Sequence, residues 1–218
     1  METIRQKTEM MPHRMEKVKV DVVQEFDSEE FIEKMIRHGL PVPPKEEIIS
    51  IPNAEIVFTK CYKWFLSRIH KQYQPQPEYK EVVNWLENNN SKGLLLYGNC
   101  GRGKSFIARY VIPAILLKYR QKAFTIVNAT DMNEMINELK YKKYLVIDDL
   151  GCEFTANIYG NKRNAFDEII DAAEQRGNLL VITSNLTIDE LMQRYGERVL
   201  GRLKALTTRI SFTGDSLR

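Results

Sequence analysis

A glycine-rich stretch directly after an apolar run constrains the fold of this chain more than any other feature. Residues 93–97 read Gly-Leu-Leu-Leu-Tyr, and residues 98–105 read Gly-Asn-Cys-Gly-Arg-Gly-Lys-Ser. In the pattern G-x-x-x-x-G-K-S, glycines let the backbone turn tightly and aim its N–H groups at phosphate oxygens. A helix that begins near Gly103 would add the positive end of its dipole. The sequence therefore predicts a strand, a phosphate-binding loop and a helix in succession, as in P-loop proteins of the α/β class.

The side chains of the loop suit a nucleoside triphosphate, expected to be ATP, bound together with Mg²⁺. We expect Lys104 to reach the β- and γ-phosphates and the Ser105 hydroxyl to ligate the metal. The alternative is a glycine-rich turn in which Lys-Ser occurs by chance, and the second motif described next disfavours it. The predicted nucleotide-binding residues of this segment are Gly98, Asn99, Cys100, Gly101, Arg102, Gly103, Lys104, Ser105 and Phe106.

Two carboxylates end a second apolar run, Tyr-Leu-Val-Ile-Asp-Asp at residues 144–149. Buried parallel strands are continuously apolar, and ligands bind beyond their carboxyl ends. We therefore expect Asp148 to hold Mg²⁺, directly or through water, and Asp149 to stand beside the γ-phosphate and polarise the attacking water. An Asp-Asp turn after a core strand is the alternative, and the phosphate-binding loop upstream counts against it.

A polar tip, Thr183-Ser184-Asn185, follows a third apolar run. Asn185 could orient the water that attacks the γ-phosphate, or contact that phosphate. The same tip is also typical of a loop, because Thr187 and Glu190 have the spacing of a capping box for the next helix. The pattern alone leaves both interpretations open.

Composition describes an ordinary globular chain and excludes several classes of protein. The 218 residues are 43% hydrophobic and 28% charged, and the net charge of +3 does not by itself indicate nucleic-acid binding. No apolar run approaches the ~20 residues of a membrane-spanning helix, and residues 1–19 lack the apolar core of a signal peptide. Cys61, Cys100 and Cys152 are too far apart in the sequence for a zinc or disulfide pattern. We therefore expect a cytoplasmic protein without a membrane segment.

The chain is predicted to contain two domains. Residues 1–48 form a small helical appendage that binds a partner protein, with a proline-rich linker at 41–44. Residues 49–218 form the nucleotide-binding domain. Within this domain, residues 49–91 hold two leading helices and residues 92–218 hold the core.

Local signals mark several helix boundaries. Asp27-Ser28-Glu29-Glu30 reads as the start of a helix that stops near Gly39. Asn53 is expected to cap the first leading helix, and Pro77 to start the second. Pro113 lies inside a helical segment and should kink it near Arg109, because proline has no N–H to donate.

Strands and helices alternate through residues 92–218. Apolar runs are separated by segments with helical periodicity. This alternation predicts a parallel sheet with helices on both faces. The predicted strands are 93–97, 124–128, 144–148, 179–183 and 208–212, and the helices between them are 103–119, 131–139, 163–176 and 188–206.

Taken together, the motifs resemble those of the AAA+ ATPases of the DnaC/DnaI helicase-loader and IstB transposition-helper group. The resemblance covers about residues 90–218. The phosphate-binding loop and the Asp-Asp motif are shared by many ATPases. The run Gly-Glu-Arg-Val with Arg202 and the terminal Ser-Leu-Arg are more specific. The residues that carry the resemblance are Gly98–Ser105, Ile147–Gly151, Thr183–Asn185, Gly196–Val199 with Arg202, and the ending Ser216-Leu217-Arg218.

The resemblance implies an AAA+ core whose five-stranded parallel sheet has the strand order 5-1-4-3-2 and which lacks a helical lid. It implies that Asn185 is sensor 1 and that Arg202 is an arginine finger acting on a neighbouring subunit. It also implies that Arg218 is sensor 2, which adds Arg218 to the nucleotide-binding set. By pattern alone, Arg198 and Arg202 are four residues apart and read as solvated arginines on one face of a helix.

The function implied by the resemblance is that of an ATP-binding and ATP-hydrolysing helicase loader in DNA replication, working as an ATP-dependent homo-oligomer. The predicted catalytic residues are Lys104, Asp149, Asn185 and Arg202. Hydrolysis by the isolated protein is expected to be slow, because Asp149 is shorter than the glutamate found in many AAA+ proteins.

A replicative helicase or a transposase is the expected protein partner. Single-stranded DNA is a further candidate, because residues 118–122 and 140–143 interleave aromatic and cationic side chains. Such stretches are also typical of solvated surface.

Three other functions stay open. The first is an IstB-like ATPase that helps the transposase of a mobile element. The second is a P-loop small-molecule kinase, which would need an acceptor pocket and an arginine-bearing lid. The third is a nucleotide-gated scaffold with negligible hydrolysis, which the short side chain of Asp149 permits.

Overall fold

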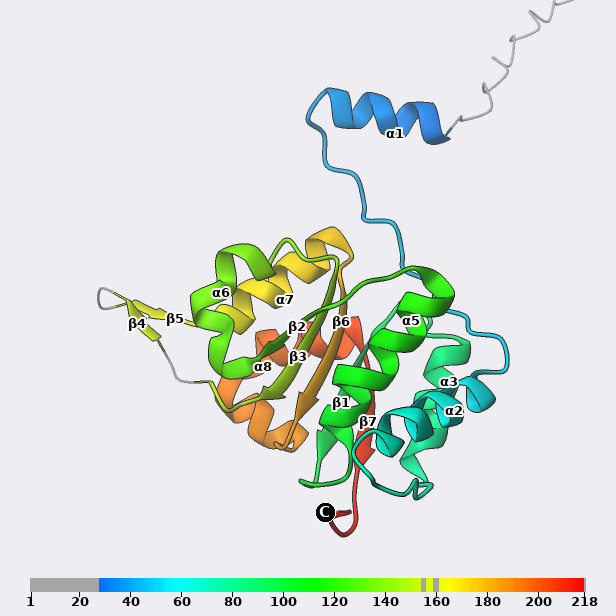
Figure 1. Cartoon of the computed structure of the whole chain (residues 1–218). Helices are drawn as coiled ribbons and strands as arrows, with labels where there is room; N and C mark the ends of the chain where they lie inside the picture. Colours follow the sequence, from blue (N-terminus) through cyan, green and yellow to red (C-terminus); the bar gives the residue numbers. More distant parts are fainter. Residues whose placement is uncertain (1–27, 154–155, 159–160, 218) are drawn as a thin grey trace, which may run out of the picture. The chain divides into compact units, whose positions relative to one another are not determined.

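The computed structural model describes residues 28–153, 156–158 and 161–217 (Figure 1). The chain divides into two compact units, Met1–Val42 and Pro43–Arg218. Each unit is described by itself below.

In the first unit, α1 (Ser28–Arg37) is an amphipathic helix. Phe31, Ile32 and Ile36 are all at least 40% exposed to solvent. The helix ends before Gly39, whose φ of +70° is in the left-handed region, close to the predicted stop. Asp27, the first residue of the predicted capping box, lies outside the described residues.

A five-stranded parallel sheet forms the centre of the second unit (Figure 1). Its strands lie in the order β2-β3-β6-β1-β7, and every neighbouring pair is parallel. Numbered along the chain, this is the predicted order 5-1-4-3-2, so the prediction of an AAA+ type sheet is confirmed. The strands are β1 (Gly93–Gly98), β2 (Thr125–Asn128), β3 (Tyr144–Leu150), β6 (Leu179–Ser184) and β7 (Thr207–Phe212).

Helices cover both faces of this sheet, as the alternation predicts (Figure 1). Successive side chains of β1 point to opposite faces: Leu94 and Leu96 are buried in one apolar cluster, and Leu95 in a second. The first cluster includes residues of α2 (Ala54–Ser67), α3 (Glu78–Glu87) and α5 (Ile112–Arg120), and the second residues of α6 (Met132–Leu139), α7 (Ala165–Arg176) and α8 (Ile188–Leu206).

The helix after β1 is irregular where Pro113 predicts a kink. It consists of α4 (Lys104–Phe106), a π-helical segment η1 (Ile107–Val111) and then α5. Pro113 cannot donate to the carbonyl of Arg109 four residues earlier, so regular α-helical bonding fails at that point. The π-helical turn contains Arg109 at its centre.

Three further local features concern the predicted boundaries. Asn53 occupies the predicted N-cap position of α2, but its backbone is left-handed, with φ of 52°, and its side chain makes no cap hydrogen bond. The capping box of Thr187 and Glu190 at the start of α8 is confirmed. A short antiparallel hairpin, β4 (Ala156–Ile158) and β5 (Asn161–Arg163), lies between β3 and α7 and was not predicted.

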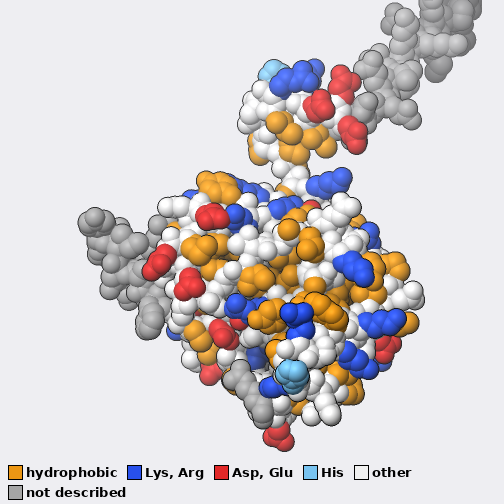
Figure 2. Space-filling model, in the orientation of Figure 1, with side chains coloured by type: hydrophobic (Ala, Val, Ile, Leu, Met, Phe, Trp, Pro, Cys, Tyr) orange, Lys and Arg blue, Asp and Glu red, His pale blue; other side chains and the backbone are white. Residues whose placement is uncertain are grey.

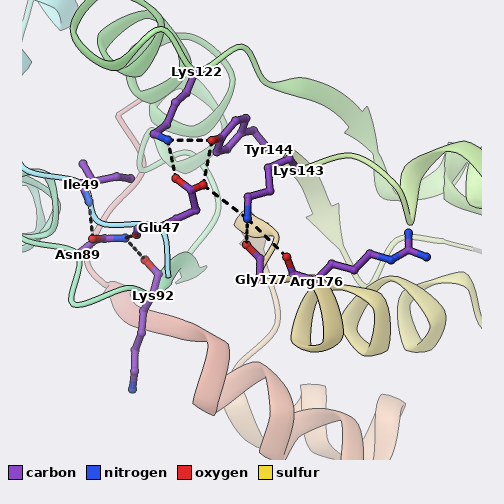
Figure 3. A network of polar contacts seen from close by, with 9 residues as sticks. All are labelled: Glu47, Ile49, Asn89, Lys92, Lys122, Lys143, Tyr144, Arg176 and Gly177. Carbon is purple, nitrogen blue, oxygen red and sulfur yellow. Dashed lines mark hydrogen bonds and ion pairs between the residues drawn. The ribbon is translucent and has the colours of Figure 1, made fainter. Parts of the chain in front are cut away.

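A polar network fixes the segment before α2 to the rest of the second unit (Figure 3). Glu47 pairs with Lys122 at 2.5 Å and Lys143 at 3.5 Å, and accepts a hydrogen bond of 3.1 Å from the Tyr144 hydroxyl. Asn89 donates to the Glu47 carbonyl at 2.8 Å and accepts from the Ile49 N–H at 2.7 Å. The compact unit therefore includes residues that precede the domain boundary expected between 48 and 49.

Apolar side chains also gather on the surface of the second unit, over α5 (Figure 2). Ile56, Trp64, Leu117 and Tyr119 are each more than 40% exposed. A groove of about 660 Å³ runs between α2 and α5 in this region. In the described parts of the chain, no helix is long and apolar enough to span a membrane.

Candidate nucleotide-binding site

The polar tips of three strands meet at one edge of the sheet. Because β3, β6 and β1 are neighbours and run parallel, their carboxyl ends lie side by side. The loop after Gly98, the aspartates near the end of β3 and Asn185 just after β6 are therefore brought into one region. This is the place where open α/β sheets bind ligands.

Glycines shape the loop after β1. Gly101 and Gly103 have φ values of +78° and +90°, a region that other residues rarely adopt. A Cβ atom at Gly103 would also lie 2.7 Å from the hydroxyl oxygen of Tyr62. The loop leads directly into α4, where the first N–H groups of a helix have no partner within the helix.

Lys104 connects this loop to the tip of β6. The residue is only 4% exposed. Its ammonium group donates to the carbonyl oxygens of Gly98 at 2.8 Å and Asn99 at 2.7 Å, and to Oδ1 of Asn185 at 2.9 Å. The cation is therefore held at the meeting point of β1 and β6.

Asp148 is nearly buried and has a partner on each carboxylate oxygen. Oδ1 accepts a hydrogen bond of 2.6 Å from the hydroxyl of Thr183, and Oδ2 lies 3.2 Å from the guanidinium of Arg109. Asp148 is 4% exposed and Thr183 is fully buried. The carboxylate is thus oriented from both sides at the end of β3.

Asp149 is turned out of the strand. The pairing of β3 with β6 shifts between Ile147 and Leu150, and Asp149 has φ of +57°. Its N–H donates to the Thr183 hydroxyl at 2.9 Å, and its Oδ1 accepts from Nδ2 of Asn185 at 3.1 Å. Asn185 therefore bridges Asp149 to Lys104, and three predicted catalytic residues form one hydrogen-bonded row.

A cavity of about 510 Å³ opens beside this row. This is within the usual size range of small-molecule sites. One wall consists of the phosphate-binding loop and the residues after it: Cys100, Gly101, Gly103, Lys104, Ser105, Phe106, Arg109 and Tyr110, with Asp149, Asn185 and Leu217 beside them. The other wall comes from α2, α3 and the link between them: Tyr62, Leu66, Ile69, Lys71, Gln72, Gln74 and Tyr79. The leading helices predicted at 49–91 therefore contribute directly to the cavity.

Aromatic rings pack where the two walls meet. The ring of Phe106 lies 5.0 Å from that of Tyr62 and 5.3 Å from that of Tyr110, measured between centroids. The hydroxyls of Tyr62 and Tyr79 are 3.2 Å apart. Burial raises the pKa of Tyr62 well above its ordinary value, so this phenol stays neutral. The cavity thus has an apolar end beside the polar row.

The Arg102 side chain does not line the cavity. It is buried and donates to both carboxylate oxygens of Glu78, at 2.8 and 3.0 Å, and to the carbonyl of Asp215 at 3.1 Å. A nucleotide contact from this residue would have to come from its backbone. Gly98, Asn99 and Asp148 are not among the residues that line the cavity either.

The end of the described chain lies along the phosphate-binding loop. The Asn99 N–H donates to the carbonyl of Phe212 at 2.8 Å, and the Leu217 N–H donates to the carbonyl of Gly101 at 3.0 Å. Arg218, predicted to be sensor 2, follows directly but lies outside the described residues.

Arg202 lies away from this cavity, on α8. Its guanidinium pairs with Asp171 and, at 2.8 Å, with Glu174, both on α7. Arg198 lies 3.7 Å from the same Asp171. Within one subunit, the structure therefore does not bring Arg202 to the other predicted catalytic residues. An arginine that acts on a neighbouring subunit must lie outside its own site in this way.

Two residues of the site had no predicted role. Thr183 bonds to both aspartates, although the sequence analysis noted only its place in a polar strand tip. Arg109 pairs with Asp148, although the sequence indicated only a kink at that position. One contact joins two strands and the other joins a helix to a strand, and no local sequence pattern encodes either of them.

The residues at this edge fit a nucleoside triphosphate and Mg²⁺. The loop glycines line the cavity at positions where a Cβ atom would clash with neighbouring side chains, and Lys104 supplies a cation beside them. The oxygen donors of Ser105 and Asp148 are of the kind that Mg²⁺ prefers. Among the described residues, no cluster of histidine, cysteine and acidic side chains forms another metal site.

Comparison with known structures supports the fold. The DnaC helicase loader superposes with a TM-score of 0.53 at 16% identity, over 65% of this chain and 94% of that one. DnaI has a TM-score of 0.49 at 21% identity, over 76% of this chain and 85% of its own. A putative primosome component from Streptococcus pyogenes has a TM-score of 0.48 at 19% identity, over 85% and 91% of the two chains. The likeness to DnaC shows a shared AAA+ fold, in agreement with the resemblance found in the motifs.

Sequence comparison identifies a family. No curated protein sequence matches this chain. The profile of the family described as Novel STAND NTPase 3 matches residues 73–213, which include the loop, both aspartates, Asn185 and Arg202. The chain therefore belongs to the Novel STAND NTPase 3 family of P-loop NTPases.

Proposed function

We propose that this protein binds ATP with Mg²⁺, hydrolyses it slowly, and uses the nucleotide state to load a helicase onto DNA in the manner of DnaC. The observation that carries the nucleotide part of the proposal is the row Lys104–Asn185–Asp149 beside a cavity lined by a glycine loop. This row puts a cation, an amide and a carboxylate together where a γ-phosphate would lie.

Each residue has a distinct proposed task. Lys104 and the loop N–H groups hold the phosphates, and Ser105 and Asp148 hold Mg²⁺, which when bound supplies positive charge against the β- and γ-phosphates. Asp149 orients a water molecule and accepts its proton as the water oxygen bonds to the γ-phosphorus and the bond to the bridging oxygen breaks. Asn185 fixes the positions of the Asp149 carboxylate and the Lys104 ammonium relative to each other through its hydrogen bonds to both.

Assembly is proposed to complete the site. Charge spreads over the γ-phosphoryl oxygens during transfer, and an arginine from a neighbouring subunit can neutralise it, with effects of about 10³–10⁵ on rate. Arg202 is the candidate, and it would have to leave Asp171 and Glu174. Arg218 would contact the nucleotide within its own subunit. Besides the short side chain of Asp149, an Arg202 that stays paired on α7 is a second reason to expect slow turnover of the isolated protein.

The partner contacts are proposed from the parts of the chain outside the site. Residues 1–48 would carry the contact with a replicative helicase. Single-stranded DNA would stack on Tyr119 and Tyr141, which are 43% and 62% exposed and have Lys118 and Lys140 close to their rings. Lys122 and Lys143 of the same basic stretches are engaged by the Glu47 network and are not proposed to contact DNA. The cytoplasm is the proposed compartment.

One observation favours a second candidate, a nucleotide-gated scaffold with negligible hydrolysis. Arg202 has two acidic partners within its own subunit, and Asp149 is already held by Asn185. A protein in this state would bind ATP and change its partners without turnover.

Steady-state phosphate release with and without single-stranded DNA tests the proposal. An ATPase loader should release phosphate slowly alone and faster when assembled on DNA, and Lys104→Ala should abolish the signal. Lys92 is exposed and directly precedes β1, at the opposite end of that strand from the phosphate-binding loop, so Lys92→Ala provides a matched control. ATP binding without phosphate release under any condition would support the scaffold instead, and absence of ATP binding would refute both.

A further inference from the structure

We propose that Arg109 is an internal counter-cation of Asp148 that Mg²⁺ must displace, so that Arg109 sets the Mg²⁺ concentration at which nucleotide binds. The inference rests on the proposed nucleotide site and adds a residue and a regulatory property to it. Nothing in the G-x-x-x-x-G-K-S pattern or in the Asp-Asp motif includes Arg109.

One guanidinium nitrogen of Arg109 joins the ends of two strands. Nη1 lies 2.6 Å from Oδ1 of Asn128 and 3.2 Å from Oδ2 of Asp148. Asn128 and Asp148 are paired in register at the ends of β2 and β3. The arginine is therefore held by two oxygens that the sheet itself places side by side.

The two partners of Asp148, Thr183 and Arg109, differ in how easily a metal ion could displace them. Thr183 is fully buried, and its hydroxyl also accepts from the N–H of Asp149, so its position is fixed. The Arg109 side chain is 32% exposed and lines the cavity. A metal ion that takes a carboxylate oxygen of Asp148 would therefore replace Arg109 and leave Thr183 in place.

Electrostatic repulsion prevents Mg²⁺ and the Arg109 guanidinium from binding the same carboxylate oxygen of Asp148 together. A nearly buried carboxylate needs a charged or hydrogen-bonding partner, because an unpaired buried charge is costly. Arg109 supplies that partner when no metal is present. Mg²⁺ and a guanidinium on the same carboxylate oxygen would repel each other, so metal binding must compete with the Arg109–Asp148 pair.

The backbone explains how Arg109 reaches this position. It lies at the centre of the π-helical segment Ile107–Val111, four residues before Pro113. Such segments are frequent at functional sites because they redirect side chains from a regular helix. Arg109 and Tyr110 both line the cavity, so a displaced guanidinium would remain beside the bound nucleotide.

The test measures Mg²⁺-dependent binding of a non-hydrolysable fluorescent ATP analogue to the full chain, so hydrolysis plays no part. Arg109→Gln removes the competing charge and should lower the half-saturating Mg²⁺ concentration about three- to tenfold, the effect expected of a partly exposed ion pair. Arg109→Lys keeps a cation, so its half-saturating Mg²⁺ concentration should lie closer to that of the wild type. Lys60→Gln removes one positive charge from an exposed position on α2 that does not line the cavity, and it should leave the Mg²⁺ midpoint unchanged.

A second variant keeps the test valid if Arg109→Gln does not fold. Asn128→Ala removes the other anchor of the guanidinium and should shift the Mg²⁺ midpoint in the same direction by a smaller factor. An unchanged or raised midpoint in a folded variant that still binds the analogue would overturn the inference while leaving the nucleotide site intact. A wild-type chain that fails to bind the analogue at any Mg²⁺ concentration would overturn the proposed function and this inference with it.

Discussion

The ammonium nitrogen of Lys104 lies 2.9 Å from Oδ1 of Asn185, so the phosphate-binding loop is tied directly to the tip of a neighbouring strand. Asn185 in turn donates to Asp149. An anion arriving at Lys104 would meet an ammonium whose position Asn185 already sets. Asn185 thereby links the phosphate-binding lysine to the carboxylate proposed to activate water.

Lys104→Ala should abolish tight binding of ATP with Mg²⁺ without unfolding the chain. The ammonium contacts carbonyls and an amide at the cavity edge and packs in neither apolar cluster. Isothermal titration with a non-hydrolysable analogue measures the loss of affinity, and a thermal melt checks the fold. Unchanged affinity would refute the phosphate-binding loop as the nucleotide site.

The two aspartates should give different phenotypes. Asp149→Asn should keep ATP affinity and lose turnover, because the amide cannot accept a proton from water. Asp148→Asn should also lose the Mg²⁺-dependent part of the affinity, because the ligand charge is gone. Binding measured in Mg²⁺ and in EDTA, together with phosphate release, separates the two, and identical behaviour would contradict the division of tasks.

Much of this architecture is predictable because it is encoded locally. The loop at 98–105, the alternation of apolar runs and helical segments, and the capping box at Thr187 each depend on neighbouring residues. The strand order came from the resemblance, since no local signal specifies which strands pair. The kink near Arg109 was predictable from Pro113, whereas its pairing with Asp148 was not, because that contact depends on the register of β2 and β3.

The Glu47 network illustrates what sequence patterns miss. Glu47 meets Lys122 and Tyr144, which are far along the chain, and the adjacent prolines indicated only a linker. The hairpin β4–β5 was missed for another reason: its strands are three residues long, too short to show an alternation. Thr183 could be recognised only once β6 was known to lie beside β3.

The Glu47 network should stabilise the second unit in a pH-dependent way. Burial alone would raise the pKa of Glu47, but Lys122, Lys143 and Tyr144 outweigh this and hold it below the ordinary value of 4.5. A carboxylate with a depressed pKa stabilises the fold above its unfolded pKa, and the effect disappears as the pH falls through the folded value. Glu47→Gln should therefore lower the free energy of unfolding by about 1–2 kcal/mol at pH 7, and the difference should shrink below about pH 4.

Urea unfolding of wild type and variant at pH 7 and pH 3.5 measures this difference. Glu46→Gln is the matched control, because Glu46 is exposed and accepts a hydrogen bond at the surface from Ser91. A deficit of equal size at both pH values would show that packing, and not charge, accounts for the role of Glu47.

Shortened chains should locate the boundary of the nucleotide-binding domain. A chain of residues 43–218 should bind ATP as tightly as the full protein, because the site lies within that unit. A chain of residues 49–218 should also bind but should melt at a lower temperature, because it lacks Glu47. Loss of ATP binding from the 43–218 chain would mean that residues 1–42 belong to the site.

Arg202 should act on a neighbouring subunit. Arg202→Ala should bind ATP normally and hydrolyse it poorly, since fingers of this kind are worth about 10³–10⁵ in rate. Arg198→Ala is the matched control, because Arg198 lies on the same helix and meets the same Asp171, with 64% of its side chain exposed. It should keep most of the turnover.

Mixing two inactive variants gives the decisive measurement. Arg202→Ala keeps an intact phosphate-binding loop and Lys104→Ala keeps an intact arginine, so some interfaces in a mixed oligomer pair the two intact parts. Phosphate release should partly return on mixing and should rise with protein concentration. Asp171→Asn, which loosens the hold on Arg202 within its own subunit, should increase the concentration-dependent turnover of the otherwise wild-type chain. If mixed oligomers form and no ratio restores activity, Arg202 has no role in trans, and its pairing with Asp171 and Glu174 is the structural contact that joins α8 to α7.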